Sequence, residues 1–149
     1  MIAISMLLTI VSAQNLNFSG NWKLNTSLSK LNAEYSFAPS EIIITQNGNE
    51  FKVEKHASFQ GEDFIIDDKY TLDGKECVNL GFQDTQKKST ANWSEDKKSL
   101  TITSKLIMGD GGEMTITEIY KIDGKNFVLS SKASSSYGEY EETMVYDKQ

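Results

Sequence analysis

The sequence predicts an all-β protein, a closed up-and-down antiparallel β-barrel of about ten strands with a short helical segment after the first strand. Apolar and polar residues alternate in short runs from Glu41 onward, which is the period of half-buried strands. Turn pairs such as Asn47-Gly48 and Asp123-Gly124 separate the runs, and links this short join antiparallel neighbours. Because an open sheet of this size would expose two edges, we expect the first and last strands to meet.

Ten runs carry this pattern and define the expected strands. In chain order they are Gly20–Asn25, Glu41–Gln46, Phe51–Phe59, Asp63–Leu72, Glu76–Phe82, Gln86–Ser94, Ser99–Met108, Glu113–Ile122, Asn126–Ser134 and Gly138–Tyr146. The turns recur about every 13 residues, with one shorter step near Gln83-Asp84, so the strands are similar in length. Sequential hairpins of similar length close into a barrel without a crossing connection.

The segment Thr26–Ser40 departs from the alternation. Its apolar side chains Leu28, Leu31 and Tyr35 stand near helical spacing, and Pro39 is a stop signal for a helix. The pattern predicts one short helix that covers one mouth of the barrel.

Residues 1–13 are expected to form a signal peptide. The uncharged apolar run Met6–Val11 is too short to span a bilayer, and it ends on Val11-Ser12-Ala13, the small-x-small pattern that signal peptidase reads. Cleavage there would leave Gln14 as the first residue. No later segment approaches the about 20 apolar residues that a membrane helix needs. We therefore expect a secreted or periplasmic protein with one domain, residues 14–149, and no membrane span.

Composition and charge indicate one globular domain. The chain has 149 residues, of which 38% are hydrophobic, and it carries a single cysteine, so it is neither disordered nor a disulfide scaffold. A formal charge of −6 weighs against a nucleic-acid partner. All 15 basic residues are lysines, so bidentate recognition of a carboxylate by a guanidinium group is not possible. Cys77 has no second cysteine in the chain to pair with, so we expect it to have a structural role. We also expect the protein to be a monomer.

The first strand carries the motif Gly20-Asn21-Trp22, close behind the expected signal peptide and ahead of an unbroken meander. This arrangement resembles the calycin superfamily, which includes the lipocalins and the fatty-acid-binding proteins, and a Gly-x-Trp motif in the first strand is the best marker of that superfamily. The resemblance implies that Trp22 closes the base of the barrel. Ten strands with an insert after the first are more similar to the fatty-acid-binding proteins than to lipocalins of about eight strands.

Three further segments, Lys88–Trp93, Asp96–Ile102 and Val145–Lys148, resemble small secreted lipocalin-like proteins of bacteria. Two features depart from the fatty-acid-binding pattern. Those proteins hold the ligand carboxylate with Arg and Tyr from late strands, whereas this chain has no Arg. They also have two helices in the insert, where this sequence has one at most. The resemblance therefore implies a binding barrel without that carboxylate site.

Several polar residues fall in the apolar phase of the expected strands. Lys55 lies between Val53 and Ala57, for example, and Glu118 lies between Ile116 and Tyr120. Strict alternation would point these side chains into the barrel, where a buried charge needs a counter-ion, a water molecule or a ligand. A β-bulge would instead reverse the phase and turn them outward. The candidate ligand-binding residues are Lys55, Asp68, Ser104, Glu118, Tyr120, Ser131, Tyr140 and Glu142.

Within this set, Lys55 is expected to pair with Glu118 or Glu142. The serine and tyrosine side chains would then orient a small polar head group, while apolar residues hold the body of the ligand.

Catalysis is not expected. His56, the single histidine, shares its strand face with Lys52 and Glu54, which indicates a solvent-facing residue rather than a general base. One histidine and one cysteine cannot assemble a zinc site or a Ser-His-Asp set. We expect no cofactor and no metal. A weak isomerase or hydrolase activity in the same cavity is a third interpretation, with Lys55, Glu118 or Glu142 as its titrating group.

The sequence thus favours an exported, non-catalytic protein that binds a small lipophilic or amphipathic molecule inside a barrel. The alternative is a protein–protein interaction or inhibitor module whose barrel core is filled by side chains. Large residues in the interior phase favour filling, namely Phe51, Phe59, Phe64, Tyr120 and Phe127.

Overall fold

The computed structural model describes residues 14–149, which form ten strands and one short 3-10 turn. The expected signal peptide lies outside the described residues. The strands are β1 (Gly20–Leu24), β2 (Glu41–Asn47), β3 (Glu50–Phe59), β4 (Glu62–Thr71), β5 (Cys77–Leu80), β6 (Gln86–Trp93), β7 (Ser99–Ile107), β8 (Glu113–Asp123), β9 (Asn126–Ser135) and β10 (Gly138–Lys148), with the 3-10 turn η1 at Phe82–Asp84. The expected strands are confirmed, except that the run Glu76–Phe82 is shortened to β5.

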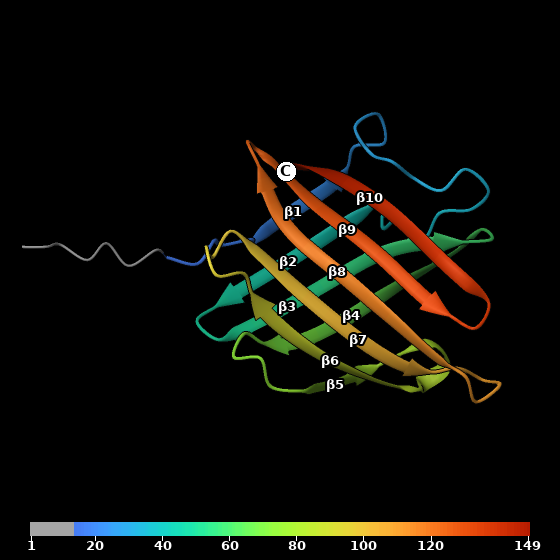
Figure 1. Cartoon of the computed structure of the whole chain (residues 1–149). Coiled ribbons are helices and arrows are strands. Elements are labelled where there is room, and N and C mark those ends of the chain that lie inside the picture. Colours follow the sequence, from blue (N-terminus) through green and yellow to red (C-terminus); the bar gives the residue numbers. More distant parts are fainter. Residues whose placement is uncertain (1–13) are drawn as a thin grey trace, which may run out of the picture.

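All ten strands belong to one antiparallel sheet with the order β4-β3-β2-β1-β10-β9-β8-β7-β6-β5. Each strand pairs with its neighbour in the chain except β4 and β5, and β1 also pairs with β10, as barrel closure predicts. The sheet curls so that β7 to β10 cross in front of β2 to β4 (Figure 1). Glycines at the hairpin tips adopt positive φ, 58° at Gly48 and 59° at Gly124, which explains the Asn-Gly and Asp-Gly turn signals.

The barrel is nearly rather than fully closed, because the hydrogen-bonded order begins at β4 and ends at β5. Side chains bridge this seam. The Asn79 amide donates to the Lys69 carbonyl at 3.0 Å and accepts from the Lys69 N–H at 2.9 Å, in the manner of a neighbouring strand. The Thr71 N–H donates to the Cys77 sulfur at 3.2 Å, which gives the single cysteine a structural contact. β5 is only four residues long and pairs its backbone with β6, so the contacts across the seam to β4 are made by side chains.

The core at one end of the barrel, here called the closed end, is aromatic. Trp22 is buried there, and its indole N–H donates to the Phe18 carbonyl at 2.9 Å. Phe18, from the segment before β1, is fully buried and packs against Phe51, Trp93, Tyr120 and Phe127 at ring-centroid distances of 5.8 to 6.2 Å. The chain that enters the first strand therefore plugs the barrel.

Three of the five large residues expected to fill the interior are buried, namely Phe51, Tyr120 and Phe127. The expectation is wrong for Phe59 and Phe64, which are 39% and 40% exposed. Both have the interior phase, but they lie at the ends of β3 and β4 that flank the turn at the open mouth.

The helix expected over Thr26–Ser40 is not formed. Polar side chains take the backbone donors that a helix would use, because the Leu28 N–H donates to the Asn25 side-chain oxygen at 3.2 Å and the Asn32 N–H donates to the Glu142 carboxylate at 2.9 Å. Asn and Ser side chains compete with helical hydrogen bonding in this way. The segment is a loop.

This loop runs beside β10 before it turns toward β2. Lys30 and Thr143 exchange two backbone hydrogen bonds of 2.7 and 3.0 Å, and the Val145 N–H donates to the Ser29 hydroxyl at 2.8 Å. The loop lies at the end of the barrel that carries the β3–β4 and β9–β10 turns (Figure 1). Within residues 14–149, no helix is long and apolar enough to cross a membrane.

Candidate ligand-binding site

The polar residues predicted from strand phase do point inward. Lys55, Asp68, Ser104, Glu118 and Glu142 are 8% exposed or less, so no bulge reverses their strands. Tyr120 is fully buried, whereas Ser131 and Tyr140 are half-buried. Ser131 is the direct cross-strand partner of both Glu118 and Glu142, which places the three on one face of β8, β9 and β10.

Lys55 and Glu118 form an ion pair, which confirms one of the two pairings expected for Lys55. The two residues come from β3 and β8, which lie five places apart in the ten-stranded order, so the pair crosses the interior. The second oxygen of Glu118 lies 3.5 Å from the Tyr120 hydroxyl. The side chains of the pair are 9% and 11% exposed, and this low exposure strengthens their attraction relative to a surface pair.

A second buried ion pair joins Lys87 to Asp68 at 2.6 Å. The Tyr70 hydroxyl donates to the same carboxylate oxygen at 3.0 Å. This pair joins β6 to β4 across the short strand β5, so it reinforces the seam of the barrel. Lys87 was not predicted because β6, with the sequence QKKSTANW, has few apolar residues to show which of its faces is buried. The buried Ala91 in the same strand carries the phase signal that would have found it.

Two further polar contacts lie in the interior, and together with the two ion pairs they form a layer of buried polar side chains, here called the polar layer. The Ser89 and Ser104 hydroxyls, on neighbouring strands, lie 2.7 Å apart. Glu142 is 2% exposed and accepts a hydrogen bond from the Asn32 N–H of the loop. Asn32 was also missed, since the loop was expected to be helical.

Burial and the carboxylates raise the pKa of three interior tyrosines. Desolvation is the largest cause for Tyr70, Tyr120 and Tyr146, and the negative charge of Glu118 is the next. The pKa of Tyr140 is raised to about 12, chiefly by desolvation and then by its hydrogen bond to Glu142. These phenols stay protonated around neutral pH and act as hydrogen-bond donors.

The mouth of the barrel is lined by aromatic side chains. Tyr35 stacks on Tyr140 with ring centroids 5.7 Å apart, and Phe37 stacks on Phe59 at 5.1 Å. The Phe37 N–H donates to the Tyr140 hydroxyl at 3.1 Å. These contacts hold the loop across the open end.

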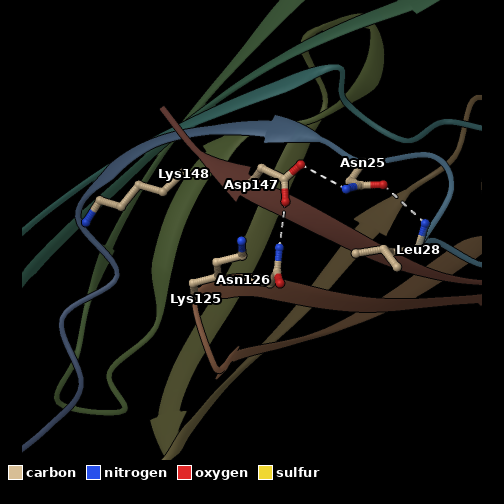
Figure 2. A pocket seen from close by; sticks show the side chains of 6 residues that line it. All are labelled: Asn25, Leu28, Lys125, Asn126, Asp147 and Lys148. Atoms are coloured by element: carbon tan, nitrogen blue, oxygen red, sulfur yellow. Dashed lines mark hydrogen bonds between the residues drawn. The ribbon is translucent and has the colours of Figure 1, made fainter.

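The outer surface of residues 14–149 carries pockets, of which two are described. The larger, about 350 Å³, lies between the start of the loop and the end of β10, where the Asp147 carboxylate accepts hydrogen bonds from Asn25 and Asn126 (Figure 2). A pocket of about 140 Å³ lies over β2 to β4. His56 is also on the outer face, where it contacts Glu54, as predicted. Within residues 14–149, no three His, Cys, Asp or Glu side chains are grouped to hold a metal ion.

The antiparallel ten-stranded barrel, with an aromatic base and a polar layer inside, has a fold like that of fatty-acid-binding proteins. Comparison with known structures shows this fold. No protein-family model and no curated protein sequence matches the chain.

Three of the similar structures illustrate the fold. A "REP1-NXSQ fatty acid transporter" has a TM-score of 0.62 and 13% identity, over 88% of this chain and 95% of that one. A zebrafish ileal bile acid-binding protein complexed with cholic acid has a TM-score of 0.61 and 15% identity, over 89% and 98%. Lipid binding protein 8 of Caenorhabditis elegans has a TM-score of 0.60 and 10% identity, over 89% and 95%.

Proposed function

We propose that this protein is an exported, monomeric, non-catalytic barrel that holds a small lipophilic or amphipathic molecule in its interior. The observation that carries the proposal is the layer of buried polar side chains inside an otherwise apolar barrel. Burial of charged groups costs free energy, and a filled core of apolar residues would avoid that cost. The similar structures, which are named for fatty acids, bile acids and lipids, support the same function.

The interior offers both parts of an amphiphile site. Ile102, Leu129 and Met144 are buried apolar wall residues, 0 to 3% exposed, on β7, β9 and β10. The ion pair of Lys55 and Glu118 stands among them and crosses the barrel. A ligand that reaches the Lys55–Glu118 pair must either displace it or bind to it. The polar end of the ligand would then contact charged groups, while its apolar body contacts the buried apolar residues.

The test is native mass spectrometry of the protein purified from its own host, followed by organic extraction. We expect a stoichiometric lipophilic compound bound to a monomer. The intact mass is expected to correspond to a chain that begins at Gln14, because the signal peptide would have been removed.

Repeated recovery of bare protein, with no tryptophan fluorescence response to a panel of lipids, would contradict the carrier function. An intact mass that includes residues 1–13 would contradict export by a cleaved signal peptide. The two results are read from the same sample and are independent of each other.

The second candidate is a protein-interaction module with a filled core. It is favoured by the cross-barrel ion pair, which occupies part of the interior, and by the pockets on the outer face, which a partner could contact. Bare protein in the mass spectrum, together with a protein partner that copurifies, would favour this candidate over the carrier.

A further inference from the structure

The buried charges inside the barrel do not balance. Asp68, Glu118 and Glu142 supply three carboxyl groups, whereas Lys55 and Lys87 supply two ammonium groups. Both ammonium groups already form ion pairs, Lys55 with Glu118 and Lys87 with Asp68. Among the ion pairs of residues 14–149, Glu142 has no lysine partner, and its hydrogen bonds come from neutral donors, the Asn32 N–H and the Tyr140 hydroxyl.

The three carboxyl groups belong to one layer. Glu142, Ser131 and Glu118 are direct partners across β10, β9 and β8, so the two glutamates are two strand spacings, about 10 Å, apart at their backbones. Asp68 lies two residues beyond Ile66, the cross-strand partner of Lys55, and Lys55 in turn pairs with Glu118. Ser131 links Glu142 to Glu118, and Lys55 links Glu118 to the strand that carries Asp68.

The layer also has an acceptor without a donor. Asp68 Oδ1 is buried and has no hydrogen-bond partner, while its other oxygen receives both Lys87 and Tyr70. The Asp68 side chain is 1% exposed, so solvent does not reach it freely. Within residues 14–149, the other buried side-chain atom without a partner is the Trp93 indole nitrogen, an uncharged donor that belongs to the ring stacked on Phe18 at the closed end.

We propose that the ligand of this barrel ends in a protonated amine and that Glu142 holds that amine beneath the loop. This inference rests on the proposed function and names the chemical class of its ligand. An alkyl ammonium group has a pKa near 10 and is positive at neutral pH, so it supplies the third positive charge. A free carboxylate would instead add a fourth negative charge to a layer that has no free lysine and no arginine.

The test compares dodecylamine, dodecanol and dodecanoic acid, three ligands with the same alkyl chain, by isothermal titration calorimetry at neutral pH. We expect the amine to bind at least about 10-fold more tightly than the acid, with the alcohol between them. The Glu142→Gln substitution should weaken the amine about 10-fold and change the alcohol by less than about twofold.

The matched control is Glu141→Gln, which removes the same charge from the exposed face of the same strand and should leave all three affinities within about twofold. Acid binding equal to or tighter than amine binding overturns the amine inference but leaves the carrier function intact, and so does an amine affinity that Glu142→Gln does not change. Failure of all three ligands to bind overturns both. The wild-type comparison stands even if Glu142→Gln does not fold.

Discussion

Replacing Lys55 with methionine is expected to destabilise the protein by about 3–5 kcal/mol. The substitution keeps an apolar side chain of similar length but leaves Glu118 as a buried carboxylate whose remaining recorded contact is the Tyr120 hydroxyl at 3.5 Å. Loss of one partner of a buried pair costs more than loss of both, because the remaining charge has no compensation. Urea unfolding measures the free energy change directly.

Two variants control this prediction. Lys52→Met removes a lysine from the exposed face of the same strand and should change stability by less than about 0.5 kcal/mol. The double substitution Lys55→Met with Glu118→Leu removes both charges and should recover most of the lost stability. If Lys55→Met costs no more than Lys52→Met, the cross-barrel ion pair does not exist in solution.

Replacing Phe18 with alanine is expected to cost about 3–5 kcal/mol, as other large-to-small changes in a packed core do. Phe18 is fully buried, and its ring contacts four other aromatic rings at the closed end. Its ring stacks on Trp93, so the same substitution should also shift the Trp93 emission to longer wavelength as water enters the gap. Chemical denaturation followed by fluorescence records both effects.

Phe64→Ala is the matched control, because Phe64 is 40% exposed at the mouth, and we expect it to cost about 1 kcal/mol or less. Equal costs for the two phenylalanines would mean that the segment before β1 is not part of the core. That result would leave the closed end of the barrel open to solvent.

Most of the fold could be predicted from the sequence because strand alternation is a strong local signal. The meander order, nine of the ten strand positions and the pairing of β1 with β10 all follow from alternation, turn residues and the avoidance of sheet edges. The prediction of a helix over Thr26–Ser40 was wrong because it rested on apolar spacing alone. In this segment the side chains of Asn25, Asn32 and Glu142 accept hydrogen bonds from backbone N–H groups that a helix would use.

The candidate site was predicted in part for a related reason. Lys55 and Glu118 lie between apolar residues of their strands, so the sequence shows that they face the interior. Lys87 lies in a strand that is polar on both faces, so its direction could not be predicted. Phe18 was missed because it precedes the first strand and belongs to no alternating run. Nothing in one sequence says which charged residues meet across a barrel, because that depends on where the sheet closes.

Methyl NMR can distinguish an amphiphile bound inside the barrel from one bound on its surface. Dodecylamine is titrated into protein with labelled methyl groups. Binding in the interior should give large shift changes for Ala91 and Met144, which point inward, and small ones for Leu28 and Ile43, which line the outer pockets. Shifts confined to Leu28 or Ile43, with Ala91 and Met144 unmoved, would contradict it.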